Sequence, residues 1–173
     1  MTSHDVTLRA MEPDDLDFLY GVENDSSLWH VGNTTVPYSR YLLHDYIANS
    51  TADIYRDGQV RLIIENESKE LIGIADVFDF DASNRRAEVS IVVHGLHRRK
   101  GYATQALLKL VDYSLRILHL HQLYALVAVD NEPSLRLFCK CGFQQSGQLK
   151  EWLFDGEKYV DVVIMQKKIE KMH

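Results

Sequence analysis

An apolar run that breaks into a basic turn and then opens a long helix is the most constraining feature of this chain. It reads VSIVVHGLHRRKGYAT from Val89 to Thr104, and its turn holds Arg98, Arg99, Lys100 and Gly101. The first N–H groups of a helix are unpaired and form the positive end of its dipole, and a glycine allows close backbone approach. The run therefore predicts a strand, a turn and a helix that together suit a phosphorylated ligand.

The same junction has other possible interpretations besides an anion site. A basic turn between a strand and a helix is also common as a plain connection in α/β proteins, and this interpretation stays open. The motifs G-x-G-x-x-G and G-x-x-x-x-G-K-[ST], which bind nucleotides, are absent from the sequence. The basic patch covers only residues 97–100 in a chain of formal net charge −6, so we expect no nucleic-acid partner.

Length and composition indicate a single domain over residues 1–173, because 46% hydrophobic and 25% charged residues suffice for one core. The N-terminus has no signal-peptide pattern, and no apolar run approaches about 20 residues, so we expect a cytoplasmic protein without membrane contact. Cys139 and Cys141 point in different directions on a predicted helix, which disfavours a mutual disulfide. No histidine spacing completes a zinc site with them, so we expect no metal.

Hydrophobic periodicity predicts eleven elements in the order βααβββαβαββ. Pro13 and Pro133 stand where helices begin, Gly142 stands where one ends, and Asp155-Gly156 is typical of a hairpin turn. The polar stretch 24–38 is predicted to be a loop or an irregular helix. The predicted strands are 6–10, 60–65, 71–79, 87–93, 123–129, 147–154 and 159–167, and the predicted helices are 14–22, 40–49, 106–118 and 133–141.

Two motifs in this element order resemble those of the GNAT acyl-CoA N-acyltransferases. One is R-x-x-G-x-A at 98–103, after the fourth strand, and the other is N-x-x-S-x-x-L-F-x-x-x-G-F at 131–143, after the fifth. Within that superfamily, segments 112–114, 117–121 and 127–131 look like bacterial spermidine N-acetyltransferases, with the acetyltransferases of ribosomal-protein N-termini nearby. The resemblance covers nearly the whole chain. It implies an α+β fold (an α/β sandwich), a single GNAT-like domain with a mixed central sheet of about seven strands and about four flanking helices.

The same resemblance implies acetyl-CoA as co-substrate, and it assigns the cofactor site residue by residue. Backbone groups of Ile91, Val92 and Val93 would hold the pantetheine arm as a neighbouring strand would. The pyrophosphate would be held by the residues of the basic junction, which are Arg98, Arg99, Lys100, Gly101, Tyr102, Ala103 and Thr104. Each of the three cations among them could equally well be solvated surface charge. The remainder of acetyl-CoA would be bordered by Asn131, Ser134, Phe138 and Lys140.

Acetyl transfer to an amine requires a base, because an alkylammonium of pKa about 10.4 is only about one part in 10³ deprotonated at pH 7. Glu88 is the candidate catalytic residue. It lies within the apolar run 87–93, at a strand position where many GNAT proteins keep a catalytic or water-ordering glutamate. The alternative is that Glu88 faces solvent or pairs with Arg85 or Arg86.

Two departures from the family pattern concern the chemistry. Phe138 stands where many relatives have a tyrosine, and phenylalanine cannot donate a proton to the leaving thiolate. Thr35-Val36 precedes Pro37-Tyr38, where the spermidine enzymes have paired glutamates that suit a polycation. Other carboxylates near this loop are candidate anionic contacts or plain helix-surface charge; they are Glu23, Asp25 and Asp45.

The sequence thus predicts an N-acetyltransferase that uses acetyl-CoA directly, without a covalent enzyme intermediate. The expected acceptor is a primary amine, either of a polyamine-like small molecule or of a peptide or protein N-terminus. The alternative, which Phe138 motivates, is an acyl-CoA-binding sensor or interaction module with weak or lost catalysis. The resemblance also implies a homo-oligomer, a dimer or larger, without fixing its symmetry.

Overall fold

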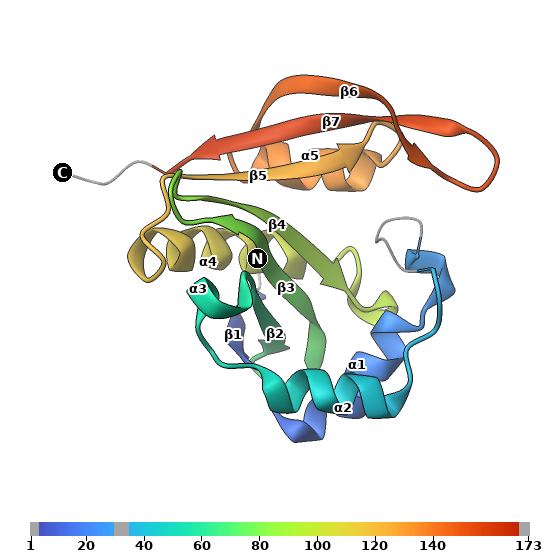
Figure 1. Ribbon diagram of the computed structural model, residues 1–173, viewed down its shortest axis with the longest axis vertical. Coiled ribbons are helices and arrows are strands. Elements are labelled where there is room, and N and C mark those ends of the chain that lie inside the picture. The colour runs from blue at the N-terminus through green and yellow to red at the C-terminus, as the bar shows by residue number, and fades with distance from the viewer. Residues whose placement is uncertain (1–3, 30–34, 170–173) are drawn as a thin grey trace.

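Seven strands form one mixed sheet in the order β1-β2-β3-β4-β5-β7-β6 (Figure 1). The computed structural model describes residues 4–29 and 35–169. Only β4 and β5 pair in parallel; the other neighbours are antiparallel. The strands are β1 (Val6–Ala10), β2 (Val60–Asn66), β3 (Leu71–Asp81), β4 (Arg86–Val93), β5 (Gln122–Ala128), β6 (Gln144–Phe154) and β7 (Tyr159–Lys168). The predicted mixed sheet of seven strands is confirmed.

In the described part of the chain five α-helices cover the two faces of the sheet, one more than predicted. They are α1 (Leu16–Glu23), α2 (Arg40–Asn49), α3 (Ile54–Asp57), α4 (Tyr102–Arg116) and α5 (Glu132–Lys140). The additional helix, α3, is a single turn that begins where Asp53 accepts a hydrogen bond from the Tyr55 N–H and ends at the left-handed Gly58. Four residues are too few to show a helical period, so the sequence pattern missed it.

The alternation of side chains along β4 assigns them to two hydrophobic clusters. Ala87 and Val89 are buried in the cluster that contains the inner face of α4 and Phe138 of α5. Val92 instead contacts the cluster formed with α1 and α2. Because successive strand residues point to opposite faces, Glu88 points away from α4 and towards the α1 and α2 face.

The parallel ladder between β4 and β5 is short. It contains three pairs, Arg86↔Gln122, Ala87↔Leu123 and Glu88↔Tyr124, and the two strands then diverge (Figure 1). Beyond Glu88, β4 continues to pair with β3, and β5 continues to pair with β7. The sheet therefore opens between its fourth and fifth strands.

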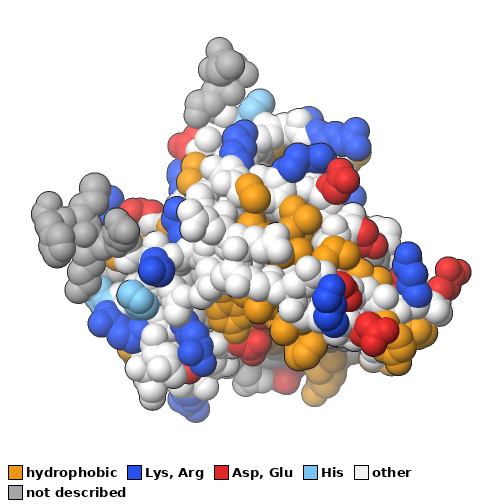
Figure 2. All heavy atoms as spheres, turned by 90° about the horizontal axis from the view of Figure 1, so that it is seen from above, with side chains coloured by type: hydrophobic (Ala, Val, Ile, Leu, Met, Phe, Trp, Pro, Cys, Tyr) orange, Lys and Arg blue, Asp and Glu red, His pale blue; other side chains and the backbone are white. Residues whose placement is uncertain are grey.

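The face that carries β6 and β7 has an exposed hydrophobic patch (Figure 2). Trp152, Phe154 and Tyr159 lie near the turn of this hairpin, and each side chain is more than half exposed. The rings of Phe154 and Tyr159 pack together, with centroids 5.3 Å apart. Exposed aromatic groups of this kind are typical of interaction surfaces.

The C-terminal end of α5 combines a strained backbone with a cation. Gly142 has φ +85°, and a Cβ atom there would lie 2.5 Å from the Lys167 Nζ. Lys167 in turn donates to the Cys141 carbonyl over 3.0 Å, which satisfies a carbonyl at the helix end. The position therefore requires glycine for its conformation, and a Cβ there would also displace the Lys167 ammonium group.

We expect Gly142→Ala to lower the free energy of unfolding by about 1–2 kcal/mol, the cost of a left-handed alanine, with displacement of Lys167 adding to it. The matched control is Gly21→Ala in α1, where no heavy atom lies within 4 Å of the new Cβ. That change should raise the free energy of unfolding by about 0.5–1 kcal/mol, because alanine is the better helix former. Urea denaturation measures both, and shifts of the same sign would contradict this account.

Candidate active site

The open edge of β4 presents unpaired backbone groups. The His94 N–H donates to the Ile72 carbonyl of β3 over 2.8 Å, so His94 and Val92, two residues before it, turn their backbone groups towards β3. Ile91 and Val93 alternate with them and turn theirs towards the side that β5 has left. Of the three strand residues that the sequence singles out, Ile91 and Val93 thus turn backbone groups to the open side, where the Val93 carbonyl accepts from Arg98, and Val92 lies between them.

The basic junction follows directly. Arg98 folds back, and its Nε donates to the Val93 carbonyl over 3.1 Å. Arg99 and Gly101 both have left-handed backbones, with φ of 62° and 84°. Gly101 is the N-cap of α4 and supplies no side-chain cap, and no heavy atom lies within 4 Å of the place a Cβ would take. The junction therefore offers uncapped helix N–H groups next to open space, as an anion cradle requires.

The first turn of α4 anchors this junction to the core. Tyr102 is buried, and its ring contacts His97 and His4 with centroids 6.0 Å and 5.1 Å away. Ala103 and Thr104 follow it and are partly buried, whereas Arg99 and Lys100 are exposed. The cations are thus at the surface, and the cradle is built from backbone.

The four predicted residues of α5 have different surroundings. The Asn131 side chain accepts from the Ser134 N–H over 3.3 Å and so caps the helix. Lys140 is exposed in the last turn. Phe138 is only 4% exposed and packs its ring against Phe143 at 5.0 Å. The side chain of Phe138 has no group that could donate a proton.

Glu88 occupies the point at which β4 and β5 separate. Its Oε1 accepts a hydrogen bond from the Leu126 N–H of β5 over 3.3 Å. Arg86 is paired with Asp81 over 3.0 Å and Arg85 donates to the His119 carbonyl over 2.9 Å, so neither arginine neutralises Glu88. Within the described residues Glu88 has no ion-pair partner.

The pKa of Glu88 is raised to about 7, chiefly by burial and to a smaller extent by the negative charge of Asp79. The hydrogen bond from Leu126 acts in the opposite direction, because it stabilises the ionised form. A carboxyl group with this pKa exchanges a proton readily near neutral pH, which is the property of a general base. Asp79 is the one influential neighbour that the sequence interpretation missed.

Each of the three candidate carboxylates near the loop before α2 is bound by another side chain of the protein. Glu23 pairs with Arg61, which also binds Asp76 through two nitrogens over 2.8 Å and 2.9 Å. Asp25 accepts from the Ser27 N–H and hydroxyl, which lowers its pKa together with the charges of Arg98 and His94. Asp45 accepts from Asn49 over 2.8 Å. All three carry negative charge to this face, and each has a structural partner.

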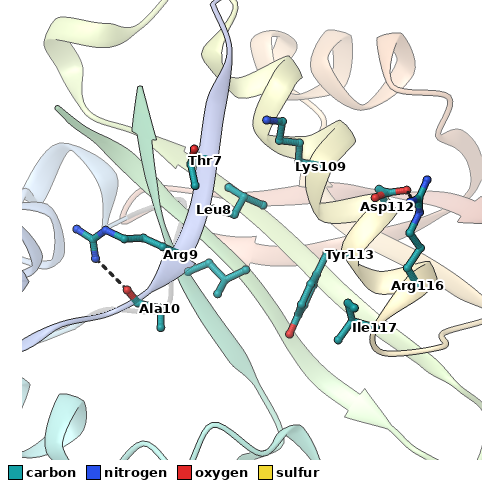
Figure 3. Close-up of a pocket in the computed structure, with 10 residues that line it drawn as sticks. Thr7, Leu8, Arg9, Ala10, Lys109, Asp112, Tyr113, Arg116 and Ile117 are labelled. Atoms are coloured by element: carbon teal, nitrogen blue, oxygen red, sulfur yellow. Dashed lines mark hydrogen bonds and ion pairs between the residues drawn. The ribbon is translucent and has the colours of Figure 1, made fainter. Parts of the chain in front are cut away.

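A groove of about 480 Å³ lies elsewhere, between β1 and α4 (Figure 3). Leu8, Tyr113 and Ile117 form its apolar part, and Asp112 pairs with Arg116 at its rim over 2.7 Å. β1 is the edge strand, three strands away from β4. The groove is therefore separate from Glu88 and the basic junction.

Residues 4–29 and 35–169 show neither a metal-binding cluster nor a membrane-spanning helix. That part of the chain holds no cluster of three or more His, Cys, Asp or Glu side chains placed to bind a metal ion. None of its helices has the length and hydropathy needed to cross a membrane. Cys139 is exposed and Cys141 is buried, and both are free thiols.

Known proteins share both the sequence and the fold. The spermidine N(1)-acetyltransferase of Vibrio cholerae is 32% identical over 157 residues, which is 91% of this chain and 89% of that one. The Bacillus subtilis protein YdaF, provisionally named a ribosomal N-acetyltransferase, is 25% identical and covers 91% of this chain and 88% of its own. Both resemblances expected from the motifs are thus found.

Solved structures of the Vibrio cholerae enzyme agree with this fold. Its complex with CoA and spermine superimposes with a TM-score of 0.85 at 31% identity, and covers 95% of this chain and 96% of that one. A dodecameric structure of the enzyme superimposes with a TM-score of 0.79 at 33% identity, with 95% and 94% covered. The family model of the acetyltransferase (GNAT) domain matches residues 5–144. The chain belongs to the GNAT family and is an N-acetyltransferase.

Proposed function

We propose that the protein transfers the acetyl group of acetyl-CoA to a primary amine of a polyamine-like cation by direct attack, with Glu88 as the base. The observation that carries the proposal is the position of Glu88, a carboxyl group of pKa about 7 where β4 and β5 diverge. The likeness to the Vibrio cholerae spermidine N(1)-acetyltransferase, crystallised with CoA and spermine, supports this acceptor class.

The residues around the divergence fit acetyl-CoA. Ile91 and Val93 offer backbone groups to an extended amide-containing arm, and the space beside Gly101 admits a diphosphate next to the uncapped start of α4. Bound there, acetyl-CoA supplies an activated acetyl thioester. Arg98 and its neighbouring cations add positive charge at the same junction.

Glu88 then serves the acceptor. At pH 7 about half of a group with pKa about 7 is ionised, so Glu88 accepts the ammonium proton through an ordered water and leaves a neutral amine for the attack. The Leu126 N–H holds the carboxylate in place during this exchange. Phe138 contributes no proton to the leaving thiolate, which with a pKa of about 8.5 leaves unassisted.

Negative charge on the α1 and α2 face supports a cationic acceptor. Glu23 and Asp76 share the single cation Arg61, so this group of three carries a net negative charge. Asp79 and Glu88 add to it without cations of their own in the described residues. These carboxylates take the place of the glutamates that the segment before Pro37 lacks.

Two further proposals concern the oligomeric state of the protein and its location in the cell. We propose a homo-oligomer, because the Vibrio cholerae relative has a dodecameric structure and this chain exposes Trp152, Phe154 and Tyr159. We place the protein in the cytoplasm, since its two free thiols suit a reducing compartment. Light scattering measures the assembly directly.

The acceptor class is tested by thiol release from acetyl-CoA with spermidine, simple amines and N-terminal peptides. We expect spermidine to give the highest kcat/KM. Preference for peptides would favour an N-terminal acetyltransferase, towards which YdaF points. Tight acetyl-CoA binding without turnover on any amine would instead support a sensor, the alternative that Phe138 raises.

We expect Glu88→Gln to lower kcat about 100-fold or more, with little change in the KM of acetyl-CoA, because only the proton acceptor is removed. In the unchanged protein kcat/KM should rise with pH through about 7, as Glu88 ionises. The variant should lack this ascending limb. A normal rate in the variant would assign the base elsewhere.

The same variant has a stability control. The raised pKa means that the folded state holds the Glu88 proton more tightly than the unfolded state, so ionised Glu88 destabilises the folded protein above about pH 7. Glu88→Gln should therefore raise the melting temperature at pH 8. A loss of activity with this gain of stability cannot come from unfolding.

We expect Gly101→Val to weaken acetyl-CoA binding at least about tenfold, because a β-branched residue resists φ 84° and occupies the space beside the helix start. The matched control is Gly156→Val, at φ 102° in the β6–β7 turn with equally open surroundings. Calorimetric titration with CoA measures both. Equal affinity in the two variants would remove the cradle from the site.

A further inference from the structure

Asp79 is a carboxylate without a partner. It lies in β3 at a bulge, where the register with β4 shifts between Phe78 and Asp81, and its backbone is left-handed with φ 49°. Its side chain is exposed and makes no ion pair or hydrogen bond with any described residue. By contrast Asp76 is bound by Arg61, and Asp81 is bound by Arg86.

Asp79 lies beside the base. Phe78, its neighbour in β3, is in register with Glu88 of β4, and Glu88 is in register with Tyr124 of β5. Burial raises the pKa of Glu88 and of Tyr124, and the charge of Asp79 adds to both shifts, as the register of the three strands leads one to expect. The cation that also acts on Tyr124 is Arg86, already paired with Asp81.

We propose that Asp79 is a specificity-determining residue that binds a second, non-reacting ammonium group of the acceptor and so selects diamines and polyamines over monoamines. This inference rests on the proposed function. It adds to it a residue and a rule for discrimination.

The reaction itself brings a cation to Asp79. One amine of the acceptor must lie at Glu88 and lose its proton, whereas every further amine, with a pKa of about 10.4, stays protonated. A polyamine thus places fixed positive charge next to the unpartnered carboxylate, and a monoamine places none there. The attraction is favourable at this exposed position without the desolvation that a buried pair would need.

The same contact acts on the base. An ammonium at Asp79 neutralises the charge that raises the pKa of Glu88, so Glu88 ionises at lower pH when a polyamine is bound. Selection and activation are then two results of one ion pair. Arg86, the cation nearest in the pairing of β4, does not compete for Asp79, because it already binds Asp81.

The test is Asp79→Asn, since asparagine accepts a left-handed backbone and keeps the shape of the side chain. We expect the KM of spermidine to rise about tenfold with kcat changed less than twofold, and kcat/KM for n-butylamine to stay within about twofold. The matched control is Asp14→Asn, which removes the same charge from an exposed residue after β1, the strand at the far edge of the sheet from β4, and which frees no cation among the described residues. It should leave the ratio of the two kcat/KM values unchanged.

A second readout is the pH profile with n-butylamine, which brings no second charge. Its apparent pKa should lie lower in Asp79→Asn than in the unchanged protein, because the raising charge is gone. An equal loss for both acceptors, or the same loss in Asp14→Asn, would overturn the role of Asp79. Failure to acetylate any amine, in the protein without substitutions, would instead overturn the proposed function.

Discussion

The early end of the β4–β5 ladder is the constraint on which the rest of the site depends. After the pair Glu88↔Tyr124 each strand keeps one neighbour and exposes backbone groups on the other side. Such groups require partners. Two side chains supply some of them within the protein, since Glu88 accepts from the Leu126 N–H and Arg98 donates to the Val93 carbonyl. What remains unpaired is where we propose that the amide-containing arm of acetyl-CoA binds.

The same divergence sets the electrostatics. Side chains alternate between the two faces of β4. A one-residue shift that moved Glu88 to the other face would therefore also move Ala87 and Val89 out of the core in which they are buried. Half-burial then costs the ionised form free energy, which one hydrogen bond from Leu126 repays only in part. The raised pKa is therefore a consequence of strand geometry, and the acidic neighbour Asp79 adds to it.

Local patterns in the sequence were sufficient for most of the fold and for part of the site. The basic turn, the prolines at helix starts and the position of Glu88 depend on residues close in the chain, and the structure has the predicted elements in the predicted order. The predicted strand 71–79 ended at Asp79, whereas β3 continues to Asp81, and the shift of register between Phe78 and Asp81 depends on the pairing with β4, which local patterns do not show. Glu23 could not be judged either, because its partner Arg61 is 38 residues away.

The substitution of phenylalanine for the expected tyrosine is consistent with this arrangement. Phe138 is buried and its ring packs against Phe143, so this position contributes to the core and carries no hydroxyl group that could donate a proton. An acid at that position would also serve a leaving group that already departs at a pKa of about 8.5, whereas the amine, at about 10.4, cannot react without a base. In the mechanism that we propose, the indispensable proton transfer is thus the one at Glu88, whose position the pairing of β4 enforces.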